Sequence, residues 1–149
     1  GYCLIASSRR GNSRLVSVVL GAENETMRAT ESQRLLNYGF QFYESTLVYK
    51  KSQTINTLRI FKGQQETVPT KLNKDFYLTL PKGDYARVKA TMTSRQPLIA
   101  PIKAGQEVGK ITFTLDGKTI NQQALVAGAS VEEAGFFGRI LDSVKLLTN

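Results

Sequence analysis

The sequence predicts a mainly β fold with two helices. Two apolar runs at residues 2–8 and 14–20, joined by a short link that contains Gly, have the length and composition of a β-hairpin. Between residues 45 and 127, short alternating runs are separated by turn signals, a pattern typical of a small antiparallel sandwich or barrel. Apolar residues at helical spacing predict one helix at about 28–42 and a second at 135–147.

The predicted opening hairpin is apolar on both faces. Its second run places Val16, Val18 and Leu20 on one face, and Leu15 and Val19 with one serine on the other. Strands of this kind are covered on both sides by other elements. A lone hairpin would leave unpaired edges and a bare apolar face. We therefore expect a neighbour that covers it, either a preceding N-terminal portion or a swapped copy of this chain.

The first predicted helix follows the hairpin. Thr30 and Gln33 have the spacing of a capping box, which would begin the helix slightly after residue 28. An apolar stripe at helical spacing indicates that this helix packs on the hairpin. The stripe consists of Leu35, Leu36, Gly39, Phe40 and Tyr43.

The middle of the chain predicts six or seven short strands. They are expected at 45–49, 56–61, 75–80, 85–92, 97–102, 109–115 and 120–127. In the run at 109–115, Ile111, Phe113 and Leu115 alternate with Lys and Thr, so one face of this strand is expected in the core and the other in water. The Asp116–Gly117 pair that follows is a strong signal for a two-residue hairpin turn.

Composition removes several kinds of chemistry. The chain has no His and one Cys, so the Ser-His-Asp triad, the Cys-His pair and the common metal clusters are absent. No Ser is followed three residues later by Lys. Cys3 lies in a strand pattern and is expected to be a small buried hydrophobe. We therefore expect no catalytic residue, metal or cofactor in this chain.

The charge is strongly positive, at +8 with a pI of about 9.7. Such a charge favours anionic partners. The basic residues are scattered, however, and no recognition helix or aromatic RNA-binding motif accompanies them, so nucleic acid is not expected to be a partner. No apolar run approaches the ~20 residues that a membrane-spanning helix needs.

The last predicted helix, GFFGRILDSVKLL, is amphipathic, and Ser130 and Glu133 before it have capping-box spacing. One interpretation is a helix docked on its own domain. The other is an interfacial membrane helix, because adjacent Phe residues and basic residues on the polar face suit that role. The membrane-anchor residues would be Phe136, Phe137, Ile140, Leu141 and Val144.

Three stretches resemble, in order, the C-terminal part of the D-alanyl-D-alanine carboxypeptidases, which are low-molecular-weight penicillin-binding proteins. GYCLIASSRRGNSRLVSVVLGAENETMRATESQRLLNYGF resembles the end of their catalytic domain. YLTLPKG and LIAPIKAGQEVGKITFTLDGKTI resemble their C-terminal β-domain, and GFFGRILDSVKLL resembles their amphipathic anchor. The resemblance implies a hairpin and helix from an α/β transpeptidase-like domain at 1–43, a β-sandwich domain at 44–134 and a truncated anchor helix at 135–149.

The resemblance implies a reaction by a serine nucleophile. In this family, a serine attacks the terminal D-Ala-D-Ala bond of the peptidoglycan stem peptide, and β-lactams acylate the same serine. The family's Ser-x-x-Lys, Ser-x-Asn and Lys-Thr-Gly motifs lie upstream of the matching region and are absent here. The chain alone is therefore expected to be inactive. The implied location is the periplasmic side of the bacterial inner membrane, with the protein held peripherally.

The resemblance implies one site residue. Arg28 matches an arginine at the edge of the family's active site, where a guanidinium can bind the carboxylate of the substrate. The alternative is a surface Arg at a helix start, where the helix dipole slightly disfavours it. An alternative for the whole chain is a non-catalytic β-domain that acts as a spacer or binds protein or glycan at the membrane surface. A weaker alternative is a β-domain that binds nucleic acid.

Overall fold

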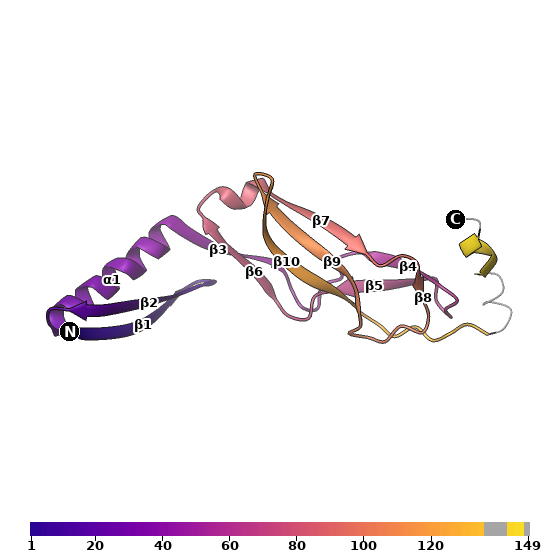
Figure 1. Cartoon of the computed structure of the whole chain (residues 1–149), viewed down its shortest axis with the longest axis horizontal. Coiled ribbons are helices and arrows are strands. Elements are labelled where there is room, and N and C mark those ends of the chain that lie inside the picture. Colours follow the sequence, from indigo (N-terminus) through magenta and orange to yellow (C-terminus); the bar gives the residue numbers. More distant parts are fainter. Residues whose placement is uncertain (136–142, 148–149) are drawn as a thin grey trace. The chain divides into compact units, whose positions relative to one another are not determined.

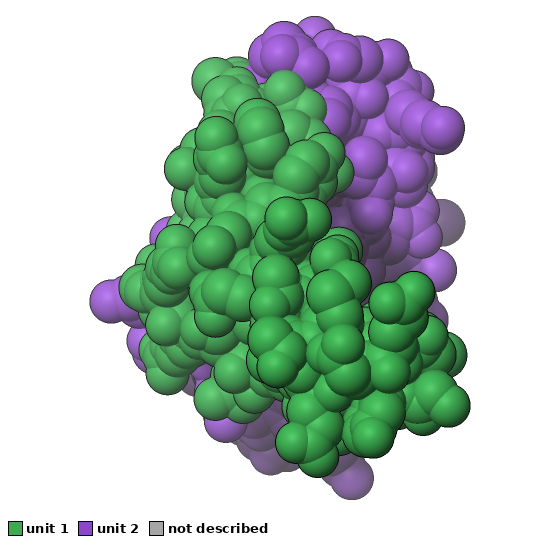
Figure 2. Space-filling model, turned by 90° about the vertical axis from the view of Figure 1, so that its left-hand side faces the viewer, with its two compact units in different colours: residues 1–47, 77–86 green, residues 48–76, 87–149 purple. Residues whose placement is uncertain are grey.

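The computed structural model describes residues 1–135 and 143–147 (Figure 1). The chain divides into two compact units, which Figure 2 shows in different colours. Unit 1 comprises residues 1–47 and 77–86, and unit 2 comprises residues 48–76 and 87–149. Most of the regular structure is antiparallel sheet, so the predicted mainly β class is confirmed.

Unit 1 begins with the predicted hairpin. Strand β1 (Tyr2–Arg10) pairs antiparallel with β2 (Ser13–Ala22), and Gly11 in the turn has a φ of 56°, which favours glycine. Helix α1 (Glu25–Phe42) follows and runs along the hairpin (Figure 1). The hairpin and the helix that packs on it are both as predicted.

Helix α1 begins earlier than the sequence predicts. Its N-cap is Asn24, which has extended backbone angles and a side chain that accepts a hydrogen bond from the Met27 amide at 2.8 Å. The predicted capping box of Thr30 and Gln33 is wrong, because both residues lie inside the helix. Asn is among the best N-cap residues because its side-chain oxygen replaces a missing backbone acceptor.

One face of the hairpin packs closely on α1. Leu36 and Phe40 are buried, and the hydroxyls of Ser17 and Ser32 share a buried hydrogen bond. At Gly39, a Cβ would collide with the end of the Leu15 side chain, so a larger residue there would require Leu15 to move. The predicted stripe is thus confirmed at its centre. Its ends differ, because Leu35 and Tyr43 are exposed.

The opposite face of the hairpin is bare. Ile5, Val16, Val18 and Leu20 have exposed fractions of 74%, 62%, 54% and 75%. These four residues are named the bare face below. Cys3 is exposed as well, so the prediction of a buried Cys3 is wrong for this chain. Nothing among the described residues of the single chain covers the bare face.

Unit 2 contains a six-stranded sheet in the order β7-β9-β10-β5-β4-β8. The strands are β4 (Thr57–Phe61), β5 (Thr67–Lys71), β7 (Val88–Ser94), β8 (Leu98–Ile99), β9 (Glu107–Leu115) and β10 (Lys118–Ala127). All neighbours are antiparallel except β4 and β8, which are parallel. A separate two-stranded sheet, most of which belongs to unit 1, pairs β3 (Tyr43–Tyr49) with β6 (Phe76–Pro81).

The core of unit 2 lies on one side of β9. Ile111 and Phe113 have exposed fractions of 0% and 1%, as the alternation in the sequence predicts. The Phe113 ring lies 4.9 Å from that of Phe76 and 6.4 Å from that of Tyr49, measured between centroids. The predicted turn at Asp116–Gly117 joins β9 to β10, and both residues have positive φ. Tyr49 and Phe76, which belong to unit 2, therefore pack against Phe113 of β9.

Three strand predictions differ from the structure. Strand β5 was not predicted, because Pro69 interrupts its short run. The predicted strand at 85–92 begins with a short 3₁₀ helix, Asp84–Arg87, and only then continues as β7. The predicted strand at 97–102 is reduced to Leu98–Ile99, which lies between two prolines that lack a backbone donor.

The C-terminal part departs from the predicted helix start. Val131 and Glu133 form β-bridges with Ile102 and Gly63, and the Ser130 hydroxyl accepts a hydrogen bond from the Ala104 amide at 3.0 Å. Ser130 and Glu133 are therefore not a capping box, because their segment is extended and tied to unit 2.

The predicted anchor falls largely outside the described residues. Phe136, Phe137, Ile140 and Leu141 are among those not described, whereas residues 143–147 are helical and Val144 is 54% exposed. Among the described helices, none has the length and apolar character needed to cross a membrane. The anchor stays a prediction.

Candidate functional site

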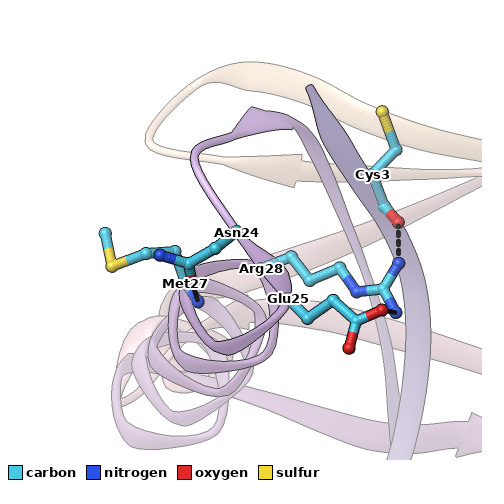
Figure 3. Close-up of polar contacts among 5 residues, drawn as sticks. All are labelled: Cys3, Asn24, Glu25, Met27 and Arg28. Carbon is cyan, nitrogen blue, oxygen red and sulfur yellow. Dashed lines mark hydrogen bonds and ion pairs between the residues drawn. The ribbon is translucent and has the colours of Figure 1, made fainter.

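Arg28 lies in the first turn of α1, where the helix meets the start of β1 (Figure 3). Its Nη1 donates a hydrogen bond to the carbonyl oxygen of Cys3 at 3.3 Å. Its Nη2 lies 3.8 Å from a carboxylate oxygen of Glu25, and its guanidinium carbon lies 5.9 Å from the centre of the Tyr2 ring. The side chain is thereby held against the first residues of the hairpin.

The guanidinium keeps capacity for a further acceptor. Its side chain is 33% exposed, and that of its ion-pair partner Glu25 is 75% exposed, so water screens this pair strongly. A guanidinium carries five N–H donors in a rigid fork, and the contacts with Cys3 and Glu25 occupy only part of that fork. The geometry therefore permits Arg28 to bind a carboxylate with two parallel hydrogen bonds.

Asn24 is the residue that positions Arg28. It fixes the first turn of α1 through its side chain, and its carbonyl oxygen accepts the amide of Arg28 at 3.1 Å. The sequence alone did not point to Asn24 as the cap, nor to Tyr2 and Glu25 as neighbours of the arginine. The signal that could have predicted Asn24 as the N-cap of α1 is an Asn that follows a strand and directly precedes a Glu.

Within residues 1–135 and 143–147, no group of three or more His, Cys, Asp or Glu residues is placed to hold a metal ion. The other feature of unit 1 that needs a partner is the bare face of the hairpin, since contiguous exposed apolar surface marks an interaction site.

Comparison with known proteins gives a consistent result. The family model described as "Penicillin-binding protein 5, C-terminal domain" matches residues 43–133. The chain is 42% identical over 147 residues to D-alanyl-D-alanine carboxypeptidase DacC of Escherichia coli (strain K12), covering 98% of this chain and 37% of that protein. It is 38% identical over 148 residues to DacA of the same strain, covering 99% and 37%. The chain thus spans little more than a third of these curated relatives.

Solved structures agree with the sequence matches. Penicillin binding protein 5 from Haemophilus influenzae superposes with a TM-score of 0.83 at 35% identity, covering 89% of this chain and 39% of that one. D-alanyl-D-alanine carboxypeptidase DacD from Francisella tularensis gives a TM-score of 0.58 at 30% identity, covering 90% and 34%. These matches confirm the resemblance predicted from the three stretches of sequence.

Proposed function

Since the chain belongs to the family of the penicillin-binding protein 5 C-terminal domain, we propose that it is the C-terminal portion of a bacterial serine-type D-alanyl-D-alanine carboxypeptidase. The names of its relatives and the small share of their length that it spans support this assignment. The proposed substrate is the peptidoglycan stem peptide that ends in D-Ala-D-Ala. The proposed location is the periplasmic side of the inner membrane.

The proposed reaction is acyl transfer through a serine that this chain does not contain. The serine oxygen forms a bond to the carbonyl carbon, the peptide C–N bond breaks, and D-alanine leaves with a proton. Water then hydrolyses the acyl-serine and restores the hydroxyl. A β-lactam acylates the same serine. The chain has no Ser-x-x-Lys sequence, so its contribution is structural and substrate-binding.

The observation that carries the proposal is the bare face of the hairpin. The hairpin has α1 on one side and four exposed apolar residues on the other, which is half of a layered α/β arrangement. We expect the catalytic portion to pair with the hairpin edges and cover this face. A swapped copy of the same chain is the other candidate for the cover.

Arg28 would then stand at the edge of the active site. Its guanidinium is held by Cys3 and Glu25 and has donors left for the terminal carboxylate of the substrate. Residues 1–43 would be the end of the catalytic domain, 44–134 the β-domain that acts as a spacer, and 135–149 the start of the anchor.

The first test is covalent labelling with a fluorescent penicillin. The 149-residue chain alone is expected to form no adduct and to release no D-alanine from a D-Ala-D-Ala peptide, because the nucleophile is absent. The same chain joined to its catalytic portion is expected to label stoichiometrically. A stoichiometric adduct on the 149-residue chain alone would contradict the proposal.

The anchor has a separate test in the whole protein. Replacing both Phe136 and Phe137 by Asp is expected to weaken binding to anionic vesicles at least about tenfold, because charged side chains oppose insertion of an interfacial helix. Flotation with phosphatidylglycerol vesicles measures this. The control is Ser52→Asp/Thr54→Asp, which adds the same charge at exposed positions of unit 2 outside residues 135–149. Unchanged flotation of the Asp variant would favour a helix docked on its own domain.

A further inference from the structure

Positive charge is concentrated in unit 2. Fourteen of the 20 Lys and Arg residues and seven of the 12 Asp and Glu residues lie there, so its formal charge is +7 against +1 for unit 1. A charge of this size attracts anionic partners and speeds their association. Unit 2 is therefore the part of the chain that is suited to an anionic partner.

Strands β7 and β9 of this unit present a polar face to solvent. Because Ile111 and Phe113 of β9 point into the core, the residues that alternate with them point outward. The register places three residues of β7 directly opposite these. The resulting threonine–lysine face consists of Lys89, Thr91 and Thr93 of β7 and Lys110, Thr112 and Thr114 of β9. All are exposed except Thr112 and Thr114, which are half-buried.

The two lysines stand at opposite ends of this face. Lys89 pairs with Thr114, and Lys110 pairs with Thr93, so the ends are four residues apart along β7, or about 13 Å. Among residues 1–135 and 143–147, neither lysine has an ion-pair partner. Both charges are therefore available to an external anion.

The carboxylates that flank the face are held by arginines. Asp116 accepts two hydrogen bonds from Arg87, at 3.2 and 3.1 Å, and a carboxylate oxygen of Glu107 lies 3.8 Å from Nη2 of Arg95. These contacts reduce the repulsion that the two carboxylates would exert on an anionic partner.

A shallow hollow lies at each end of the threonine–lysine face. The first, of about 390 Å³, is lined by Arg87, Lys89, Thr114, Asp116 and Gly117. The second, of about 170 Å³, is lined by Thr93, Ser94, Arg95, Glu107, Gly109 and Lys110. Each combines an ammonium group, a threonine hydroxyl and an arginine–carboxylate pair. Such a set of groups can donate hydrogen bonds to carboxylates. It can also donate hydrogen bonds to hydroxyl and amide groups and accept hydrogen bonds from them.

The composition of the face separates two classes of anionic partner. Binding to a lipid surface is strengthened by large apolar side chains that enter the bilayer, and this face has none. A hydroxyl-rich polymer that carries carboxylates needs dispersed hydrogen-bonding groups with a few cations, which is what the face offers. The chemistry therefore favours a polysaccharide with carboxylate-bearing side groups over a membrane.

We propose that the threonine–lysine face binds a carboxylate-bearing glycan–peptide polymer, with Lys89 and Lys110 on carboxylates and the threonines on hydroxyl and amide groups. The identity of the polymer rests on the proposed function, which has peptidoglycan as its substrate. The face takes no part in hydrolysis. It holds the polymer on unit 2 while the stem peptide reaches an active site elsewhere in the protein.

The test is co-sedimentation of the 149-residue chain with purified, insoluble peptidoglycan. The variant Lys89→Glu/Lys110→Glu is expected to raise the dissociation constant at least about tenfold, because two attractions become repulsions. The matched control is Lys50→Glu/Lys74→Glu. It makes the same charge change at two exposed positions of unit 2 that lie outside the threonine–lysine face. The control is expected to change the constant less than about twofold.

Two further arms identify the group that is bound. Converting the carboxylates of the peptidoglycan to amides is expected to reduce binding of the unsubstituted chain to the level of the double variant. Lys89→Gln/Lys110→Gln, which adds no negative charge, is expected to give an intermediate constant and serves if the Glu variant unfolds. Equal loss in variant and control, or no loss in either, would overturn the proposal. Lysine-dependent binding to phosphatidylglycerol vesicles without binding to peptidoglycan would overturn it in favour of lipid.

The sedimentation experiment can fail or succeed independently of the carboxypeptidase activity. The sedimenting chain lacks the nucleophile, so its binding cannot depend on hydrolysis. A whole protein that releases no D-alanine would overturn the proposed function and leave a measured lysine-dependent interaction standing. A chain that fails to sediment would overturn the polymer site alone.

Discussion

Val18→Asp is expected to abolish most of the activity of the whole protein while leaving the fold of the 149-residue chain intact. In the single chain, Val18 is 54% exposed, so a carboxylate there keeps its hydration, and the free energy of unfolding should change by less than about 1 kcal/mol. Under a covering catalytic portion, the same carboxylate would be buried without a partner. The cost of that burial is several kcal/mol, enough to separate the two parts.

The matched control for this prediction is Leu35→Asp. Leu35 is 52% exposed on α1, and no cover is assigned to it. Thermal unfolding of the isolated chain and D-alanine release by the whole protein are measured for both variants. The proposal expects a difference between them only in the whole protein. Equal activity of Val18→Asp and the unsubstituted protein would mean that the bare face is not buried.

Arg28→Ala is expected to reduce kcat/KM of the whole protein for D-Ala-D-Ala peptides by roughly 10- to 150-fold. This range corresponds to losing a hydrogen bond to a charged group, about 1.5–3 kcal/mol. Arg28→Lys is expected to recover part of the loss, because the charge remains but the two-pronged geometry does not. Steady-state kinetics on a soluble peptide measure both variants.

A peptide with an amidated C-terminus makes this prediction specific. It lacks the carboxylate, so the Arg28→Ala variant and the unsubstituted protein should hydrolyse it at similar rates. Arg34→Ala is the control on the same helix, because Arg34 is 74% exposed and its ion-pair partner is Glu31 of the same helix, at 3.5 Å. Equal losses on the free and amidated peptides would show that Arg28 holds the hairpin through Cys3 rather than binding substrate.

Strong local patterns account for the parts of the fold that the sequence predicted correctly. The hairpin follows from two β-branched runs and a Gly turn, and the core of β9 follows from the alternation of Ile111 and Phe113 with polar residues. These signals are short in range, since each is contained in one continuous stretch of the chain. The register between β7, β9 and β10 needed the structure.

Competing local signals account for the predictions that were wrong. Asn24 begins α1 although Thr30 and Gln33 have the spacing of a cap, because the strand that ends at Ala22 leaves Asn24 extended and able to accept the Met27 amide. Ser130 and Glu133 have the same spacing, yet pairing with Ile102 and Gly63 extends their segment. The spacing of capping residues in the sequence does not show which tertiary contacts a segment will make.

The candidate site, too, could be predicted only in part from the sequence. Arg28 was identified through resemblance, because an isolated arginine near a helix start carries no signal of its own. Its neighbours Tyr2 and Cys3 are more than twenty residues away in sequence, and only the pairing of β1 with β2 and the packing of α1 bring them close. The threonine–lysine face depends likewise on the register of two strands.

Hydrogen exchange of the β1 and β2 amides tests most directly whether this chain completes a larger catalytic sheet. Each strand of the hairpin has one partner, so half of its backbone groups face an open edge in the single chain. The amides that face the open edges are expected to exchange rapidly in the 149-residue chain and to become strongly protected in the whole protein. Equal exchange in the two would contradict this expectation, because the hairpin would then have no neighbour to complete.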